Sequence, residues 1–138
     1  MEIQLKIIGV LLIALALLHA VFPTYFRWSR DLAGLQPINR QMMYVHAFFI
    51  ALTVFLMGVL CLTCSPELTG TPLGRKVACG LAVFWAARLL VQFFGYSSSL
   101  WRGKTFETAA HVVFAVFWTY LATGFLAIAW TPARTMPW

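Results

Sequence analysis

The chain has 138 residues, of which 62% are apolar and only 10% are charged. Soluble domains contain roughly 45–50% apolar and about 25% charged residues, so the composition excludes an ordinary soluble fold and indicates an integral membrane protein. The formal net charge is +6, but no basic stripe or aromatic stacking platform accompanies it, and we therefore expect no binding to nucleic acid.

Four continuous apolar segments follow one another, at about residues 3–22, 43–64, 77–96 and 108–130. Each is long enough to cross a bilayer, because a membrane helix needs about 20 mostly apolar residues at ~1.5 Å per residue. Strands are disfavoured, since the runs do not alternate and four strands could not close into a barrel in lipid. We predict one all-α membrane domain, an up-down bundle of four transmembrane helices with both termini on the same side.

The first segment has some features of a secretory signal peptide. Lys6 precedes the apolar stretch, but Glu2 weakens the basic start. Bulky Val21 and Phe22 stand where small residues would mark a cleavage site. We therefore expect an uncleaved span, which Pro23 ends.

The first connection, at residues 23–42, is long for a helical bundle. Within it, Trp28, Leu32 and Leu35 fall at helical spacing, with charged residues on the other faces. This pattern predicts a short interfacial helix lying flat on the membrane. Pro37 then turns the chain into the second span.

The remaining breaks are Ser65-Pro66, Ser97-Ser98-Ser99 and Thr131-Pro132. Orientation depends on the basic residues outside the spans. The first and third loops share one face and carry Arg27, Arg30, Arg40, Arg102 and Lys104; the opposite face carries Lys6, Arg75, Lys76 and Arg134. The loop face carries five basic residues and the opposite face four, which favours loops inside and both termini outside. We expect the membrane to be a bacterial inner membrane. The lipid bilayer is the expected partner, with other membrane subunits or a homo-oligomer left open.

The depth of the histidines is the most informative feature of the sequence. His19, His46 and His111 each lie about one turn from the end of their span that faces the first and third loops. Because alternate helices run in opposite directions, all three fall at one level. That level is roughly 5 Å beneath the face that carries these loops.

The third span adds Gln92 at a similar depth and Arg88 one turn deeper, on the same helix face. Glu107 stands one turn from His111, so all four spans place a polar group in one leaflet. Inserting an arginine near a helix centre costs ~2.5–3.5 kcal/mol, so Arg88 is expected to need a wet cavity or an anionic partner. The candidates are Glu107, Asp31 of the first loop and the acidic group of a ligand.

Three kinds of site suit these side chains, and the sequence does not separate them. His19, His46 and His111 with Glu107 would suit a transition metal such as Zn²⁺, Fe²⁺ or Cu²⁺. Two of the histidines would suit b-type haem, with Arg88 neutralising a propionate. A quinone pocket is the third possibility, since histidine and glutamate exchange protons with ring oxygens.

In each of these sites the roles of the side chains follow from their chemistry. The three histidines would be ligands or proton carriers, and Glu107 would orient His111 or accept a proton. Arg88 with Gln92 would clamp an acidic or carbonyl group. The chain contains no HExxH motif, which counts against a strongly metal-dependent enzyme, and whether the protein is an enzyme stays open.

The predicted function is therefore that of a small polytopic membrane protein with an intramembrane polar site for a redox cofactor, metal or quinone. The alternative is a non-catalytic small subunit or scaffold of a larger membrane complex, with the polar groups serving as interhelical hydrogen bonds. A transporter is a third option, but four unbroken helices argue against it unless the protein oligomerises.

The cysteines lie toward the opposite face of the membrane. Cys61 and Cys64 form a CxxC motif at the end of the second span, and Cys79 begins the third. The flanks are apolar and no second pair exists to relay electrons, so we expect small buried hydrophobes. A thiol oxidase, or a Cys64–Cys79 disulfide in an oxidising compartment, remains the alternative.

Overall fold

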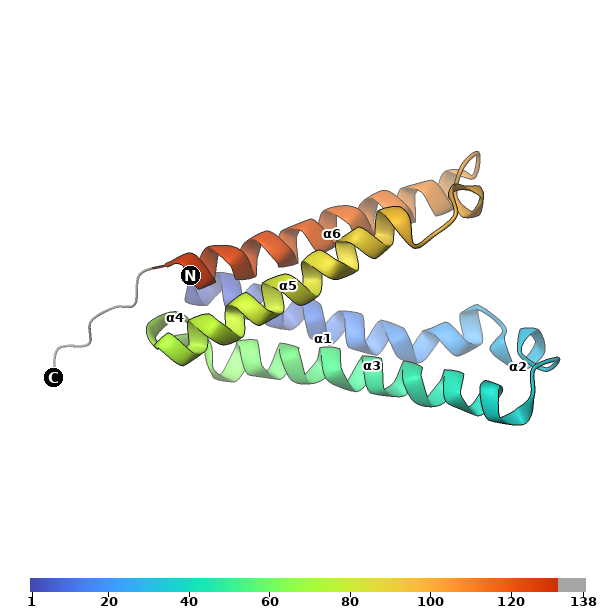
Figure 1. Ribbon diagram of the computed structural model, residues 1–138, viewed down its shortest axis with the longest axis horizontal. Coiled ribbons are helices and arrows are strands. Elements are labelled where there is room, and N and C mark those ends of the chain that lie inside the picture. Colours follow the sequence, from blue (N-terminus) through green and yellow to red (C-terminus); the bar gives the residue numbers. More distant parts are fainter. Residues whose placement is uncertain (132–138) are drawn as a thin grey trace, which may run out of the picture. The chain divides into compact units, whose positions relative to one another are not determined.

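The computed structural model describes residues 1–131 and is helical throughout its regular elements, without a strand in that range (Figure 1). Pro132, predicted to end the fourth span, and Arg134, counted in the charge balance, lie outside the described residues. The elements in order are α1 (Glu2–Tyr25), α2 (Trp28–Asp31), α3 (Pro37–Thr63), α4 (Ser65–Gly70), α5 (Pro72–Phe94), the 3-10 helix η1 (Ser98–Leu100) and α6 (Thr105–Trp130).

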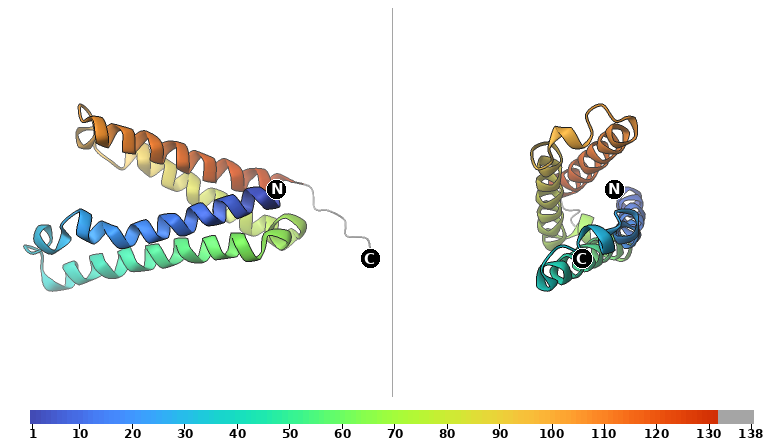
Figure 2. Two further views of the ribbon diagram at one scale, coloured as in Figure 1. Left: turned by 180° about the vertical axis from the view of Figure 1, so that it is seen from behind. Right: turned by 90° about the vertical axis from the view of Figure 1, so that its right-hand side faces the viewer.

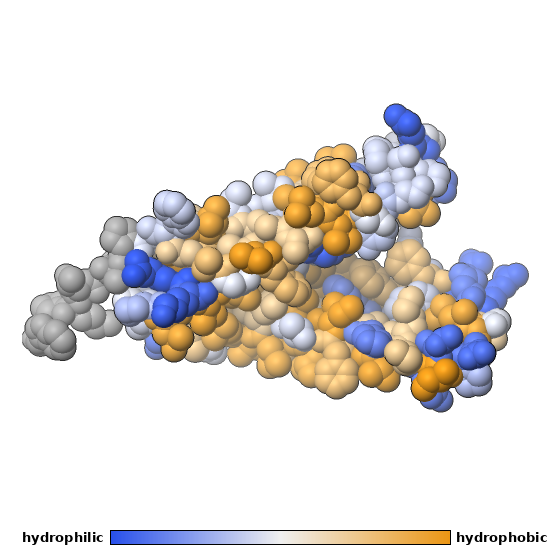
Figure 3. Space-filling model, in the orientation of Figure 1, coloured by the Kyte–Doolittle hydropathy of each residue, from blue (hydrophilic) through white to orange (hydrophobic). Residues whose placement is uncertain are grey.

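Four of these helices, α1, α3, α5 and α6, are long and apolar enough to cross a membrane. Large apolar side chains remain exposed along them, including Ile3, Val10, Leu17, Phe48, Leu56, Val83, Leu90, Val113 and Val116. Figure 3 shows the same pattern, with mostly hydrophobic residues along the helices and hydrophilic residues gathered near their ends. A surface this apolar needs lipid around it, which fits a multi-pass membrane protein.

The helices begin or end beyond the predicted spans. α3 begins at Pro37 rather than near residue 43, because proline is well tolerated in the first turn of a helix. α1 continues through Pro23 to Tyr25, so the expectation that Pro23 ends the helix was wrong. The proline lacks an N–H, but this removes only one hydrogen bond within the last turn, to the carbonyl of His19.

The first connection contains one short helix, α2, which covers four residues and does not reach Leu35. The ring of Trp28 meets the ring of Tyr44 edge-on at 5.6 Å, which ties this connection to the first half of α3. That α2 lies in the membrane interface stays a prediction. The second and third connections contain α4 and η1, two short helices that were not predicted from the sequence.

The chain divides into two compact units, and Glu2–Ser65 forms one of them. Its long helices α1 and α3 pack side by side and antiparallel (Figures 1 and 2). The two backbones lie close together at Gly9 and Gly58, where a Cβ on either glycine would lie 2.9 Å from the carbonyl oxygen of the other. Small residues allow this backbone contact, as is common between membrane helices.

The unit that begins at Pro66 is built on the antiparallel pair α5 and α6. Both helices place a stripe of side chains with spacing three and four toward the pair, which is the pattern of left-handed helix packing. The stripes consist of Ala78, Leu81, Trp85, Arg88 and Gln92 on α5 and of His111, Phe114, Trp118, Leu121, Phe125 and Ile128 on α6. The up-down bundle of all four long helices stays a prediction.

Candidate functional site

The polar end of the α5–α6 stripe carries the candidate site. Arg88 lies six residues before the end of α5 at Phe94, about 9 Å along the axis at ~1.5 Å per residue. Gln92 follows one turn later and is only 7% exposed. A buried amide must find hydrogen-bond partners, and its partners define the site.

The side-chain amide of Gln92 joins three other side chains, and we call these four residues (Arg88, Gln92, His111 and Trp118) the Gln92 network. The amide oxygen accepts a hydrogen bond from Nη1 of Arg88 at 3.2 Å and another from Nε1 of Trp118 at 3.3 Å. The amide nitrogen lies 2.9 Å from Nδ1 of His111. Arginine and tryptophan have only donors, so the oxygen must face them and the NH₂ group must face the histidine.

This orientation determines the tautomer of His111. Because the amide nitrogen donates to Nδ1, that ring nitrogen is an acceptor and the imidazole proton sits on Nε2. The ring is held between two aromatic side chains, stacked on Trp101 at 4.6 Å and edge-on to Phe93 at 6.0 Å. The Thr108 hydroxyl donates to the carbonyl oxygen of Trp101 at 2.7 Å, which anchors the stacking residue. His111 therefore presents a fixed N–H donor.

Arg88 has aromatic and amide partners rather than a carboxylate. Its guanidinium carbon lies 4.8 Å from the ring centroid of Trp118 and 5.8 Å from that of Tyr96. Within the described part of this unit no carboxylate forms an ion pair with it. Two cation–π contacts of about 0.5–2 kcal/mol each and a charged hydrogen bond of ~1.5–3 kcal/mol sum to about 2.5–7 kcal/mol, which is enough to offset the ~2.5–3.5 kcal/mol cost of insertion. The aromatic cage thus lets a cation remain in the leaflet.

Trp118 is the centre of an aromatic stack within the same pair of helices. Its ring lies parallel to Trp85 at 5.2 Å and to Phe114 at 5.6 Å. Trp85 is 1% exposed, and its indole N–H has no hydrogen-bond partner among the described residues. A buried donor without a partner costs about 1–3 kcal/mol. Besides the N–H of His111, this indole N–H is thus another unpaired donor near the Gln92 network.

The other two histidines bond to their own helices. Nδ1 of His19 donates to the carbonyl oxygen of Leu15, and Nδ1 of His46 to that of Met42, both at 2.8 Å. A carbonyl can only accept, so the proton is on Nδ1 and Nε2 keeps its lone pair. This is the arrangement that metal-binding histidines adopt. His19 is half-buried and extends the buried stripe of α1, whereas His46 is exposed.

The structure brings together Arg88, Gln92 and His111, as their predicted depth required. Glu107 is exposed in the first turn of α6, and the residue that orients His111 is Gln92. His19 and His46 belong to the other unit, so a site shared by all three histidines stays a prediction. No group of three or more His, Cys, Asp or Glu side chains in the described residues is placed to hold a metal ion, and metal binding also stays a prediction.

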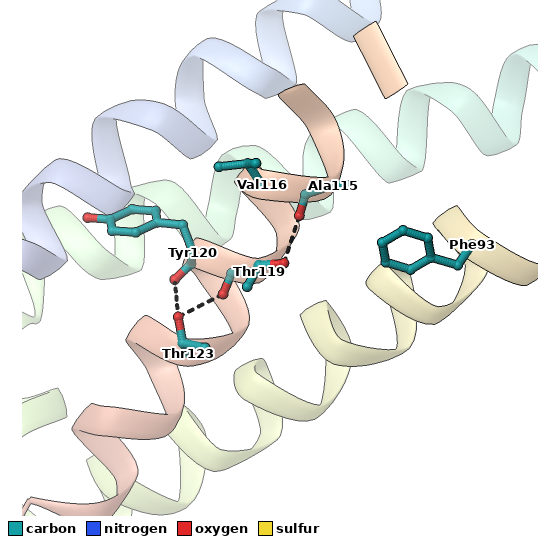
Figure 4. Close-up of a pocket in the computed structure, with 6 residues that line it drawn as sticks. All are labelled: Phe93, Ala115, Val116, Thr119, Tyr120 and Thr123. Atoms are coloured by element: carbon teal, nitrogen blue, oxygen red, sulfur yellow. Dashed lines mark hydrogen bonds between the residues drawn. The ribbon is translucent and has the colours of Figure 1, made fainter. Parts of the chain in front are cut away.

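An open depression of about 440 Å³ lies beside the network on the same pair of helices (Figure 4). Phe93, the edge-on neighbour of His111, lines one side of it, and the rest of the lining comes from α6. The hydroxyl of Thr119 donates to the backbone carbonyl oxygen of Ala115 at 2.8 Å. The hydroxyl of Thr123 donates to the backbone carbonyl oxygen of Thr119 at 2.7 Å. With their hydroxyls turned to the helix, both threonines offer methyl groups, and the wall is mainly apolar.

Sequence reasoning overlooked the aromatic part of the site. Trp118 lies seven positions after His111, and Trp85 lies seven positions before Gln92. A seven-residue spacing along each helix could therefore have identified both tryptophans. Trp101 belongs to an irregular connection, and no periodic signal places its ring on His111.

The three cysteines are free thiols. Cys61 is buried in α3, Cys64 is half-buried and Cys79 is exposed. Burial of Cys61 agrees with the expected role of a small hydrophobe, and the exposed Cys79 departs from it.

Comparison of the chain with protein-family models, with curated proteins and with solved structures found no match.

Proposed function

We propose that the chain is a small multi-pass membrane protein that holds the head group of a lipid-soluble quinone at the Gln92 network. The observation that carries this proposal is the hydrogen bond from Gln92 to Nδ1 of His111, which leaves the Nε2–H of His111 as a fixed donor. The guanidinium of Arg88 offers further donors one turn away. Quinone carbonyl oxygens are acceptors and match both groups.

The depth of the site also suits a quinone head. Arg88 lies about 9 Å below the end of α5 at ~1.5 Å per residue, a level at which a head group remains close to water and protons. Histidine is the side chain best suited to proton exchange near neutral pH. We propose that His111 serves this purpose, and that His19 and His46 are additional proton carriers.

The depression beside Phe93 offers room for the isoprenoid tail. It is lined by Phe93, Ala115, Val116, the ring of Tyr120 and two back-bonded threonines, a mainly apolar set that suits an isoprenoid chain. A head group bonded to His111 would lead its tail past Phe93 into this depression, because the two rings touch. Amphiphilic ligands are commonly held in this way, with few polar contacts and a largely apolar wall.

Two other functions each have one supporting observation. The hydrogen bonds of Nδ1 to backbone carbonyls leave Nε2 of His19 and His46 available, which favours b-type haem or a metal. The bonds from Gln92 to His111 and from Trp118 to Gln92 connect α5 with α6, which favours a non-catalytic subunit whose polar groups fasten helices.

One experiment separates these functions. The full chain in lipid nanodiscs is titrated calorimetrically with a decyl-substituted benzoquinone, with empty nanodiscs as the reference, and its visible absorption and metal content are recorded. We expect saturable binding that weakens about tenfold or more in His111→Phe, which keeps an aromatic ring but loses both ring nitrogens. Gln41→Leu, at an exposed position of α3, is the control and should bind as the parent does.

Each alternative gives its own result. A Soret band or stoichiometric metal that disappears in His19→Ala and His46→Ala would replace the quinone proposal with a haem or metal site. A colourless, metal-free protein that binds no quinone would leave the scaffold function.

A further inference from the structure

The side chains of the site have free hydrogen-bond donors, whereas their acceptors are already occupied. The Gln92 network contains two side-chain acceptors. The first is the amide oxygen of Gln92, which already accepts two hydrogen bonds. Nδ1 of His111 is an acceptor as well, and the amide nitrogen of Gln92 occupies it. No acceptor of the network is left for a ligand.

The remaining polar atoms are all donors. His111 has its Nε2–H, and Arg88 has four N–H groups beyond the one directed at Gln92. Trp85, one turn before Arg88 on the same stripe, adds a buried indole N–H without a partner in the described residues. This indole N–H lies outside the Gln92 network, and it too is a donor without an acceptor in the described part of the chain.

We infer that the site selects head groups that only accept hydrogen bonds, and that it binds the oxidised quinone in preference to the quinol. This preference rests on the proposed quinone binding and adds to it a choice of redox state. A quinone carbonyl accepts from His111 or Arg88 without any further requirement. A quinol brings two O–H groups that need acceptors, and both acceptors of the network are already occupied, so its hydroxyl protons would find no acceptor in the network.

Gln92 controls this choice, because its amide decides which nitrogen of His111 carries the proton. A carboxylate in the same position would accept from Arg88 and Trp118 on one oxygen and from an Nδ1–H of His111 on the other. Nε2 of His111 would then become an acceptor. The variant Gln92→Glu is therefore expected to move the preference from quinone to quinol while keeping the size of the side chain.

The test compares the decyl-substituted benzoquinone with its chemically reduced quinol. Both are titrated under argon into the full chain in nanodiscs, for the parent, Gln92→Glu and the control Gln41→Glu, which adds the same charge at an exposed position of α3. The parent and Gln41→Glu should bind the quinone about tenfold or more tightly than the quinol, and Gln92→Glu should lose or reverse this ratio. The imidazole ¹⁵N spectrum of Gln92→Glu should show the proton of His111 moved to Nδ1.

The outcomes distinguish the two levels of the proposal. Equal affinity of the parent for quinone and quinol would overturn the inferred selectivity and leave quinone binding intact. An unchanged ratio in a Gln92→Glu protein whose His111 tautomer has moved would also overturn it. Binding of neither compound to the parent would remove the proposed function itself, and the selectivity with it.

Discussion

The amide nitrogen of Gln92 on α5 lies 2.9 Å from Nδ1 of His111 on α6, across 19 positions of sequence. This hydrogen bond joins two helices and also sets the tautomer of a histidine, so one contact serves both the fold and the chemistry of the site. Hydrogen bonds between polar side chains of neighbouring helices are a common way for membrane helices to associate.

Gln92→Leu is expected to destabilise the α5–α6 pair by about 1–3 kcal/mol. The substitution introduces an apolar side chain of similar size and removes the acceptor of Arg88 and Trp118 and the donor to His111. Reversible unfolding in mixed micelles, followed by tryptophan fluorescence, measures the change. Gln41→Leu controls for the loss of an exposed amide and should leave the unfolding midpoint unchanged.

Gly58→Ala is expected to weaken the contact between α1 and α3 by about 1–3 kcal/mol, because overpacking costs energy of this size. The new Cβ would lie 2.8 Å from the side chain of Ile13 and 2.9 Å from the carbonyl oxygen of Gly9. The same unfolding assay applies. Gly80→Ala is the control, since nothing lies within 4 Å of its Cβ position and alanine favours the helix.

Gly74→Ala is expected to be more damaging than Gly58→Ala. Its Cβ would collide with the backbone of Glu67 and Leu68, where α4 turns into α5, and a backbone cannot rotate away as a side chain can. Limited proteolysis should cut the chain near α4 sooner in this variant than in Gly80→Ala. Equal cleavage rates in the two variants would contradict the tight turn.

Four membrane crossings predict the sides on which the connections lie. In a cysteine-free background, Ser29→Cys and Ser98→Cys should react with a membrane-impermeant maleimide from one side of sealed vesicles, and Glu67→Cys from the other. All three positions are exposed in the structure. Reaction of Ser29→Cys and Ser98→Cys from opposite sides would contradict the four crossings.

The helices and the polar residues were predictable because both follow from position along the chain. Apolar runs and breaks located the four long helices, and depth alone placed Arg88 and Gln92 near His111. The continuation of α1 through Pro23 was not predicted, because one missing hydrogen bond in the last turn is not enough to end a helix.

The partners of Arg88 were not predictable in the same way. The sequence predicted a wet cavity or an anionic partner, whereas the structure surrounds the guanidinium with Trp118, Tyr96 and the amide of Gln92. Aromatic side chains near a membrane face have several roles, and only the packing of α5 on α6 selects this one.

The most direct test of the proposed site is the tautomeric state of its histidines, read from imidazole ¹⁵N chemical shifts of the full chain in micelles. The hydrogen bonds predict that His111 carries its proton on Nε2, while His19 and His46 carry theirs on Nδ1. The signals are assigned by replacing one histidine at a time, with His111→Phe for the site. One Nε2–H and two Nδ1–H imidazoles would support the account, and an Nδ1–H on His111 would contradict it.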